Sequence, residues 1–474
     1  MRLNKIQEPL LQFGRGVAIC PRVGITQYDV YDTLIPGRRE KINVGAVGTS
    51  ECLEKLGNWL KICSEPIAGV SSNIQLHPDF CGFNKENGFK AEFAYFDNLT
   101  RSLANSDIKT IKNIKNRDER VNAAIDLYYR NIEFLVRHRN VDVVVCIIPT
   151  EIFSIISKES TLHSESEEKI EDNSEEILEL NFRRSLKART MHFGKPLQLV
   201  REITLQTNVK TQQDDATKAW NFCTALYYKA NRTVPWKLIT NPDRPSICYA
   251  GIGFYRSRDR KTLHTSIAQV FDELGNGVIL RGVPIELLNK KDRVPHLSEE
   301  QAFNLLKRAL AEYETALNTS PGRIVLHKSS NYTEGELEGF RQATKDMRVR
   351  SADFVTIQDA SIRLIRNGIY PPYRGMHIEL DKENHILYTR GFVEQYRTYP
   401  GKYIPQPLEI KIVESDESPN IICSEILGLS KMNWNNTQFD RKYPITIECA
   451  RKVGEIMKYI PEHEDPQISY SFYM

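Results

Sequence analysis

Several patterns that would define a function class are missing from this chain. No apolar run reaches about 18 residues, the length that a membrane-spanning helix needs, so we expect no membrane partner. The nine cysteines are scattered and form no CxxC pair, and the ten histidines form no HxxxH or HExxH pattern. This argues against a disulfide scaffold and against a zinc site. Because the first residues also lack the apolar core of a secretory signal, we predict a cytoplasmic protein with reduced thiols.

The composition is typical of a soluble globular protein with two to four domains, since 41% of the 474 residues are hydrophobic and 26% are charged. The net charge of +3 is unevenly distributed, because residues 158–180 hold nine acids and two bases. The other residues carry 62 bases against 52 acids, and a basic surface attracts polyanions such as nucleic acids. We expect the acidic segment to be a solvated surface insertion, with an acidic mimic of nucleic acid as the alternative.

Hydrophobic periodicity predicts alternating strands and helices. Residues 42–47 indicate a strand, followed by a helix that Thr49 or Ser50 caps. Residues 120–139 carry apolar side chains every three or four positions, as a helix does, and lead into VDVVVCIIP, a run typical of a buried parallel strand. From residue 245 onward, strand-like segments surround a long helix. The predicted fold class is therefore α/β, in two successive domains.

Four polar side chains of the first domain are suited to hold a phosphate. Arg183 and Lys187 stand four residues apart and share one helix face. Gln198 lies in the following GKPLQLV segment, and Lys229 lies near the end of the next helix. A phosphorylated nucleic-acid end carries a charge of about −2 and needs several cationic or amide donors from different segments. Without the other two residues, Arg183 and Lys187 would indicate only an exposed basic helix face.

The order of the segments resembles the MID and PIWI domains of Argonaute proteins, in particular the short prokaryotic Argonautes, which lack the N-terminal and PAZ domains. CYAGIGF, IVLHKSSNYTEGELEGF, LGLSKMNWNN and YPITIECARKVGEIMKYI follow one another in that family's order. The resemblance covers most of the chain except the acidic segment. It implies an N-terminal linker or β segment at 1–41, a Rossmann-like MID domain at 42–244 with the acidic insertion 158–180, and an RNase H-like PIWI domain at 245–474.

By this resemblance, Arg183, Lys187, Gln198 and Lys229 would bind the 5′-phosphate of a guide strand. The family often has a tyrosine at the first of these positions, where the ring stacks on the first base. The guanidinium plane of Arg183 can also stack, and it adds charge.

Two neighbours and the C terminus complete the candidates for this pocket. Phe182 or Arg184 could take the place of Arg183 at the position that stacks on the first base. The family's C terminus often folds back toward the pocket, where a carboxylate can help to bind a metal. The resemblance therefore makes the Met474 carboxylate a candidate ligand for Mg²⁺ at the guide 5′-phosphate, and it implies no organic cofactor.

The resemblance also implies an inactive nuclease. Slicing members hold two metal ions with acidic side chains. Here those positions fall on Gly253, which offers no ligand, on Ser329, which offers a neutral hydroxyl, and on Arg451, which would repel a metal. We therefore expect no metal in the PIWI domain and no enzyme activity of this chain. The alternative is a guide-directed nuclease in which Asp259 or Asp272 builds a non-standard metal site.

The LGLSKMNWNN segment lies near the nucleic-acid channel in the family. The resemblance makes Lys431, Asn433, Asn435 and Asn436 candidate contacts to the nucleic-acid backbone, because amide and amine donors suit phosphates and sugars without sequence bias.

The implied function is that of a guide-binding subunit in prokaryotic antiviral immunity. Such a subunit binds a 5′-phosphorylated guide, usually RNA, and recognises complementary single-stranded DNA of an invader without cleaving it. In heterodimers, it then triggers a partner protein that has an APAZ domain and a sirtuin-like or TIR effector, which depletes NAD and kills the cell. The competing hypothesis is an α/β protein unrelated to nucleic acid.

Overall fold

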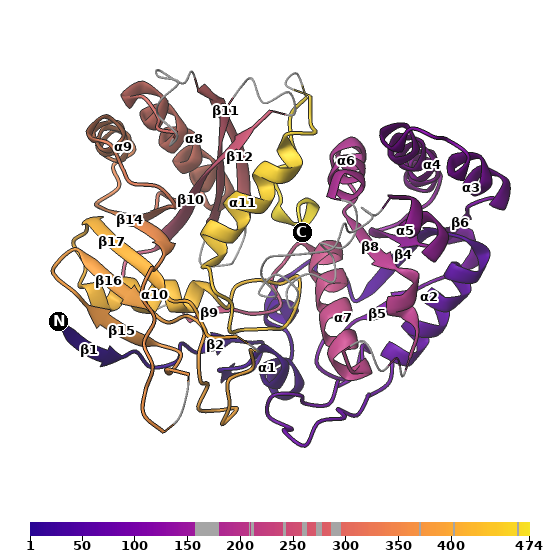
Figure 1. Cartoon of the computed structure of the whole chain (residues 1–474), viewed down its shortest axis with the longest axis horizontal. Coiled ribbons are helices and arrows are strands. Elements are labelled where there is room, and N and C mark those ends of the chain that lie inside the picture. Colours follow the sequence, from indigo (N-terminus) through magenta and orange to yellow (C-terminus); the bar gives the residue numbers. More distant parts are fainter. Residues whose placement is uncertain are drawn as a thin grey trace. The chain divides into compact units, whose positions relative to one another are not determined.

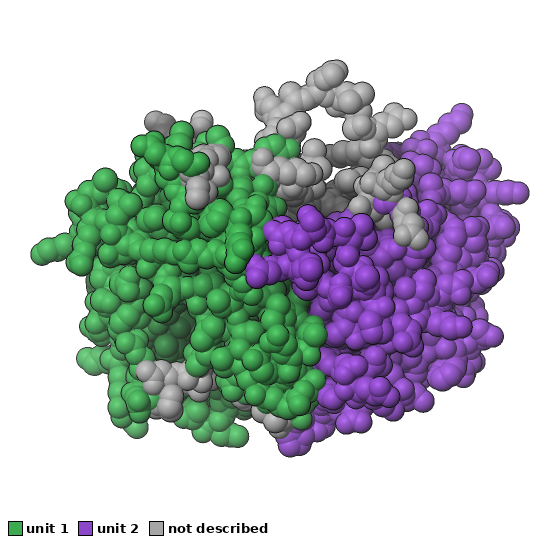
Figure 2. Space-filling model, turned by 90° about the horizontal axis from the view of Figure 1, so that it is seen from below, with its two compact units in different colours: residues 1–34, 233–474 green, residues 35–232 purple. Residues whose placement is uncertain are grey.

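The computed structural model describes residues 1–156, 180–207, 209, 213–239, 243–257, 263–271, 277–285, 295–368, 371–401, 403–461 and 464–474. The chain divides into two compact units (Figure 2): residues 1–34 and 233–474 form unit 1, and residues 35–232 form unit 2. The predicted acidic insertion lies outside the described residues except for Leu180, which begins a helix. None of the helices in the described ranges is both long and apolar enough to span a membrane.

A parallel sheet forms the centre of unit 2 (Figure 1). Its described strands follow the order β5-β4-β7-β8, and β6 also pairs with β4. Every residue of β7 is buried, which confirms the prediction from its unbroken apolar run. The strands are β4 (Lys41–Gly48), β5 (Glu92–Ala94), β6 (Thr100–Ser102), β7 (Val143–Ile148) and β8 (Leu197–Arg201).

Helices cover both faces of this sheet. The helices are α2 (Ser50–Cys63), α3 (Asn105–Lys112), α4 (Arg117–His138), α5 (Thr150–Ile156), α6 (Leu180–Thr190) and α7 (Asp215–Asn231). Apolar side chains of α3, α4, α5 and α6 form one core with β7 and β8. Trp59 of α2 packs edge-on against Phe222 of α7, with ring centroids 6.4 Å apart. Unit 2 is therefore a layered α/β structure.

Local signals in the sequence set the ends of these helices. Thr49 accepts a hydrogen bond from the Cys52 N–H at 3.3 Å and so begins α2, as predicted. Asp214 caps α7 by accepting from the Thr217 N–H at 3.0 Å. The same helix ends at Arg232, whose φ of 62° is left-handed. This end places Lys229 in the last turn, where the helix dipole favours a cation.

A mixed sheet forms the centre of unit 1. Its described strands follow the order β1-β15-β16-β17-β14-β13-β10-β11-β12. Strands β10, β13 and β14 run parallel to one another, and the other neighbours are antiparallel. The strands are β1 (Arg2–Lys5), β10 (Ile247–Arg256), β11 (Leu263–Phe271), β12 (Gly277–Ile285), β13 (Arg323–Lys328), β14 (Ser351–Asp359), β15 (Met376–Glu379), β16 (Asn384–Leu387) and β17 (Leu408–Glu414).

Two helix pairs pack on this sheet. The helices are α8 (Glu299–Leu317), α9 (Glu334–Asp346), α10 (Pro419–Leu429) and α11 (Ile445–Met457). Apolar residues of α8 and α9 form a core with β10, β13 and β14. A second core joins α10 and Ile447 of α11 to β14, β16 and β17. The long helix predicted after residue 245 is thus confirmed as α8.

The N-terminal residues complete unit 1. Strands β2 (Leu11–Gln12), β3 (Val17–Ala18) and β9 (Lys237–Leu238) form a small antiparallel sheet, and helix α1 (Pro21–Tyr28) follows β3. The β structure predicted for the N-terminal stretch is therefore present. The described 3₁₀ helices are η1 (Tyr31–Leu34), η2 (Asp97–Leu99), η4 (Met191–Phe193), η5 (Glu202–Leu205) and η6 (Tyr470–Phe472).

Candidate nucleic-acid interface

Gln198 and Lys229, two of the predicted phosphate ligands, are in direct contact in unit 2. The Lys229 ammonium donates a hydrogen bond to Gln198 Oε1. Both side chains are buried, with 1% and 6% exposure for Lys229 and Gln198. Because side chains alternate along a strand and Leu197 and Leu199 join the core with α4 and α6, Gln198 points to the opposite face of β8. The bond therefore fixes the end of α7 on that face of the strand.

Lys187 reaches the same pair of strands from α6. Lys187 is 3% exposed, and its charge acts on Cys146 of β7. Burial raises the pKa of the Cys146 thiol, and the positive charge of Lys187 offsets part of this rise. Cys146 pairs with Leu199 of β8, directly beside Gln198. Figure 1 shows α6 and α7 next to β8, the edge strand of the sheet. Lys229 and Gln198 thus meet on one face of β8, whereas Cys146, on which the charge of Lys187 acts, belongs to the core on the other face.

The stacking position is less closely defined. Arg183 and Arg184 are half-buried on α6, one turn before Lys187. Phe182, in contrast, is fully buried, and its ring packs edge-on against Tyr128 with centroids 5.6 Å apart. The Phe182 ring belongs to the core of unit 2, which leaves Arg183 and Arg184 as the candidates for stacking on a base.

Met474, the remaining predicted phosphate ligand, lies in unit 1. It is 2% exposed, and Ser471 to Tyr473 are buried as well, as their apolar character suggests. The described residues contain no group of three or more His, Cys, Asp or Glu side chains that could hold a metal ion.

The three positions predicted to have lost metal ligands surround the β10–β13 strand pair of unit 1. Ser329 directly follows β13 and lies across from Gly253, because the register pairs Ile252 with Lys328. Arg451 lies on α11, next to Ala450, whose carbonyl oxygen would be 2.9 Å from a β-carbon on Gly253. Arg451 is exposed, and its guanidinium carbon lies 4.1 Å from the centre of the Tyr443 ring. Asp259 and Asp272, the alternative ligands, lie outside the described residues.

His327 precedes this edge on β13 and is fully buried. Its Nδ1 lies 2.8 Å from Thr446 Oγ1 of α11. Burial, reinforced by the charge of Arg323, lowers the pKa of His327 to about 3, so the ring is neutral at physiological pH. A neutral, buried histidine bonded to a threonine packs α11 against the sheet.

Two of the four predicted channel residues are buried in unit 1. Lys431 is 0% exposed and forms an ion pair with Glu8 at 2.8 Å, and its pKa is lowered by burial to about 8. Asn433 is 1% exposed and donates to Glu448 Oε1 at 2.9 Å. Asn435 and Asn436 are half-buried.

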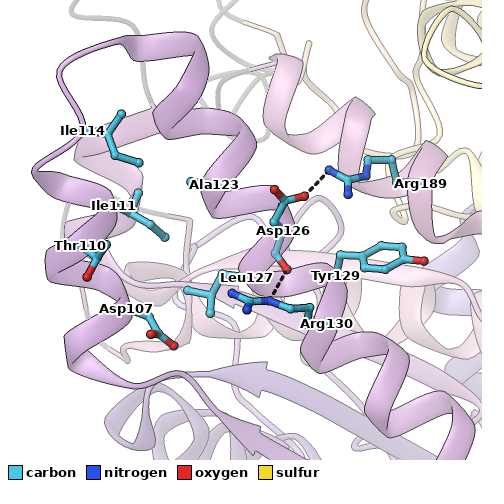
Figure 3. A pocket seen from close by; sticks show the side chains of 10 residues that line it. All are labelled: Asp107, Thr110, Ile111, Ile114, Ala123, Asp126, Leu127, Tyr129, Arg130 and Arg189. Carbon is cyan, nitrogen blue, oxygen red and sulfur yellow. Dashed lines mark hydrogen bonds and ion pairs between the residues drawn. The ribbon is translucent and has the colours of Figure 1, made fainter.

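A pocket in unit 2 was not predicted from the sequence. It lies between α3 and α4, has an apolar floor that includes Ile111 and Leu127, and has Arg189 of α6 at its rim (Figure 3). Figure 3 shows Asp126 between the two arginines of the pocket, and its carboxylate pairs with Arg189 at 2.6 Å. Because the walls come from three helices, no local sequence pattern could have predicted it. The carboxylate makes this pocket less suited to a phosphate than the surroundings of β8.

Comparisons with solved structures identify similar folds. Argonaute of Clostridium butyricum, bound to a guide DNA with a 5′ deoxycytidine and to a 19-mer target DNA, matches with a TM-score of 0.67 and 15% identity over 99% of this chain and 54% of that chain. Drosophila Piwi matches with a TM-score of 0.60 and 14% identity over 99% and 56% of the two chains.

A third match is Argonaute of Marinitoga piezophila in complex with a 5′-OH guide RNA, with a TM-score of 0.56, 13% identity and coverage of 100% and 59%. This chain thus spans a little more than half the length of these structures. No protein-family model and no curated protein matches the sequence. The shared architecture is nevertheless specific: the chain has an Argonaute-like α/β fold, in which a Rossmann-like MID arrangement is combined with an RNase H-like PIWI arrangement.

Proposed function

We propose that this protein binds a 5′-phosphorylated guide strand, an RNA as in the short prokaryotic forms it resembles, and pairs it with complementary single-stranded DNA. The observation that carries the proposal is the contact between Lys229 and Gln198 on β8, with Lys187 reaching the neighbouring strand. The buried Lys229 ammonium beside the Gln198 amide, with the charge of Lys187 added from α6, suits the charge and the acceptor oxygens of a terminal phosphate. Two of the structural neighbours were solved with a guide strand, one of them with a 5′-hydroxyl, which supports guide binding by analogy but not the choice of a 5′-phosphate.

The proposal includes target recognition without cleavage by this chain. Gly253, Ser329 and Arg451 at the β10–β13 edge offer neither carboxylates nor imidazoles, the ligands that a pair of catalytic metal ions requires. Base pairing would then supply the specificity, and the protein would recognise the guide–target duplex by its shape and backbone.

A signal to a partner protein would complete this function. By resemblance to the short prokaryotic Argonautes, the partner is an APAZ-domain protein whose sirtuin-like or TIR effector consumes NAD when a target is bound, and the result is death of the invaded cell. Affinity purification of the tagged protein from its native host, followed by mass spectrometry and sequencing of bound nucleic acid, tests this step. Recovery of neither a second protein nor short RNA would contradict it.

Mg²⁺ at the guide 5′-phosphate is the cofactor that we propose, with the Met474 carboxylate as a ligand. The Met474 carboxylate would help to hold the ion, which would supply positive charge next to the phosphate. Guide affinity should then fall in EDTA and recover with added Mg²⁺. A variant extended by two glycines beyond Met474 should lose this dependence, while the wild type keeps it.

The central experiment measures binding of a fluorescent oligonucleotide with a 5′-phosphate and of the same oligonucleotide with a 5′-hydroxyl. Wild-type protein should prefer the phosphorylated strand, and the Lys187→Glu/Lys229→Glu double variant should lose both affinity and preference. Because glutamates at these buried positions could unfold unit 2, Lys187→Met/Lys229→Met serves as a second variant that removes charge but keeps an apolar stem. Circular dichroism checks its fold.

The matched control reverses two exposed lysines of the same unit, Lys61→Glu and Lys109→Glu. It changes the net charge equally and should keep the preference for the 5′-phosphate. Equal binding by wild type and by the Lys187/Lys229 variants would refute the pocket. A separate assay with Mg²⁺ or Mn²⁺ and a guide–target pair tests the absence of cleavage, and clear product would favour the nuclease alternative.

A further inference from the structure

One edge of the unit 1 sheet collects polar side chains. The parallel strands β13 and β14 both end there, and ligands of α/β sheets bind at the carboxyl ends of parallel strands. Gln358, at the end of β14, donates a hydrogen bond to the Ser329 carbonyl at 3.0 Å. Asp359 follows and is 42% exposed. The ends of the two strands are therefore joined and reach solvent together.

Helix α11 brings a cation to this edge. Two glycines of β10 permit a close approach: a β-carbon on Gly251 would be 2.2 Å from the Thr446 carbonyl oxygen, and one on Gly253 would be 2.9 Å from that of Ala450. Arg451, the next residue, stacks on Tyr443, whose hydroxyl bonds to Asp359 at 2.6 Å. The glycines thus fix the helix position that places Arg451 beside the strand ends.

The charges at this edge favour an anion. Lys442 pairs with Asp359 at 3.0 Å and also donates to Gln406 at 2.7 Å. Among the described residues, Arg451 makes no ion pair with a carboxylate within 4.0 Å, while the neighbouring Lys452 pairs with Glu448 at 3.0 Å. The two cations Lys442 and Arg451 face the single carboxylate of Asp359, so these three side chains carry a net charge of +1. Arg451 also forms a hydrogen bond with the Tyr443 side chain, and its charge acts to lower the pKa of Asp359. The other N–H groups of its planar guanidinium suit an anionic acceptor such as a phosphate.

We propose that Arg451 and Lys442 form a phosphodiester-binding site that holds the backbone of the guide–target duplex at the carboxyl ends of β13 and β14. This inference rests on the proposed function, since it assigns a contact to the duplex that the guide would form. Arg451 binds a non-bridging phosphate oxygen pair, Tyr443 holds the guanidinium plane in position, and Lys442 adds charge. The site binds a phosphate without hydrolysing it.

The test combines Arg451 variants with a salt titration. In Arg451→Ala, binding of the target to the guide-loaded protein should weaken about 5–10-fold, and the slope of log Kd against log salt should fall by about one phosphate contact. Arg451→Lys keeps the charge without the planar fork and should give an intermediate affinity. The control Lys382→Ala removes an exposed cation between β15 and β16, several strands away from β13. It should change neither the target affinity nor the salt slope. Equal stability of the variants, checked by thermal denaturation, separates a binding role from a structural one.

Neutral methylphosphonate linkages identify the phosphate and its strand. They are introduced one at a time, first in the target and then in the guide. At one linkage, the difference between wild type and Arg451→Ala should disappear, and the strand that carries this linkage is the one bound. If wild type binds guide and target but Arg451→Ala binds equally well, or if no linkage removes the difference, the phosphodiester site is refuted and the proposed function stands. If wild type does not prefer a 5′-phosphorylated guide, the proposed function itself fails.

Discussion

Gly253 lies so close to Ala450 that a β-carbon on the glycine would be 2.9 Å from the Ala450 carbonyl oxygen and 3.0 Å from its β-carbon. A carboxylate at this position therefore has no space unless α11 moves. We predict that Gly253→Asp lowers the free energy of unfolding of unit 1 by about 1–3 kcal/mol through overpacking. We also predict that it does not create guided cleavage. Chemical denaturation and a cleavage assay with Mn²⁺ check the two parts.

Ser329→Asp is the matched variant at the same edge. Ser329 is half-buried and follows the strand, so an aspartate there should fold with a stability close to wild type. A Gly253→Asp protein as stable as Ser329→Asp would show that α11 is not held by the glycine contact.

Glu448 joins helix α11 to the segment that precedes it. Its carboxylate accepts from Asn433 at 2.9 Å and pairs with Arg441 at 2.7 Å. Burial alone would raise the pKa of Glu448, but Arg441 and Lys452 outweigh it and lower the pKa to about 2. We predict that Glu448→Gln, which leaves Arg441 without its charge partner, lowers the free energy of unfolding by about 3 kcal/mol.

The sign of the pH dependence follows from this shift. A depressed carboxyl pKa contributes stability above the unfolded value of about 4.5, which is lost as the pH falls toward 2. Glu448→Gln should therefore be relatively less sensitive to acid than wild type. The half-buried pair Glu455–Lys458 is more accessible than Glu448 and provides the control, because Glu455→Gln should cost less than about 1 kcal/mol. Urea titrations at several pH values measure both.

His327 should contribute acid sensitivity at a higher pH. Its folded pKa of about 3 lies below the ordinary value of 6.5, because the buried ring must stay neutral. The unfolded chain takes up a proton that the folded protein does not, so stability is complete above pH 6.5 and falls by up to about 1.4 kcal/mol per pH unit between 6.5 and 3. In His327→Gln, the slope of unfolding free energy against pH should be smaller by this amount.

The control for this slope is His138→Gln, at an exposed position at the end of α4. It should leave the slope unchanged. A slope that is the same in wild type and His327→Gln would mean that His327 gains a proton in the folded state.

Gln198→Glu tests the phosphate pocket without removing a lysine. The new carboxylate would keep the bond to Lys229 and neutralise it, so unit 2 should remain folded with an unchanged or higher melting temperature. Affinity for a 5′-phosphorylated strand should fall about tenfold or more, which corresponds to about 1.4 kcal/mol, because the carboxylate competes with the phosphate. The exposed Gln75→Glu adds the same charge elsewhere in unit 2 and should bind like wild type. Phosphate-independent binding in all three proteins would contradict the assignment.

The elements that the sequence predicted are those with local signals. The all-buried β7 follows from an unbroken run of β-branched residues, and the start of α2 follows from the Thr49 cap. The contact of Gln198 with Lys229 joins residues 31 positions apart, and only the resemblance to a known family pointed to it.

Other contacts could not be predicted because they depend on distant segments. Lys431 in a polar turn is typical of an exposed, nucleic-acid-binding lysine, but its ammonium pairs with Glu8, 423 positions earlier in the chain. Asn433 is occupied by Glu448 in a similar way. Periodicity and composition report on neighbours in sequence, so they contain no signal for a partner that the tertiary fold supplies.

The pairing of β1 with β15 has a consequence for biosynthesis. The partner strand begins at Met376, about 370 residues after β1, so at the usual rate of about 5–20 residues per second β1 waits roughly 20–75 seconds on the ribosome for its neighbour. An unpaired strand is a risk for aggregation during that time, and flanking charges reduce it. Arg2 and Lys5, at the two ends of β1, supply such charges to the nascent chain.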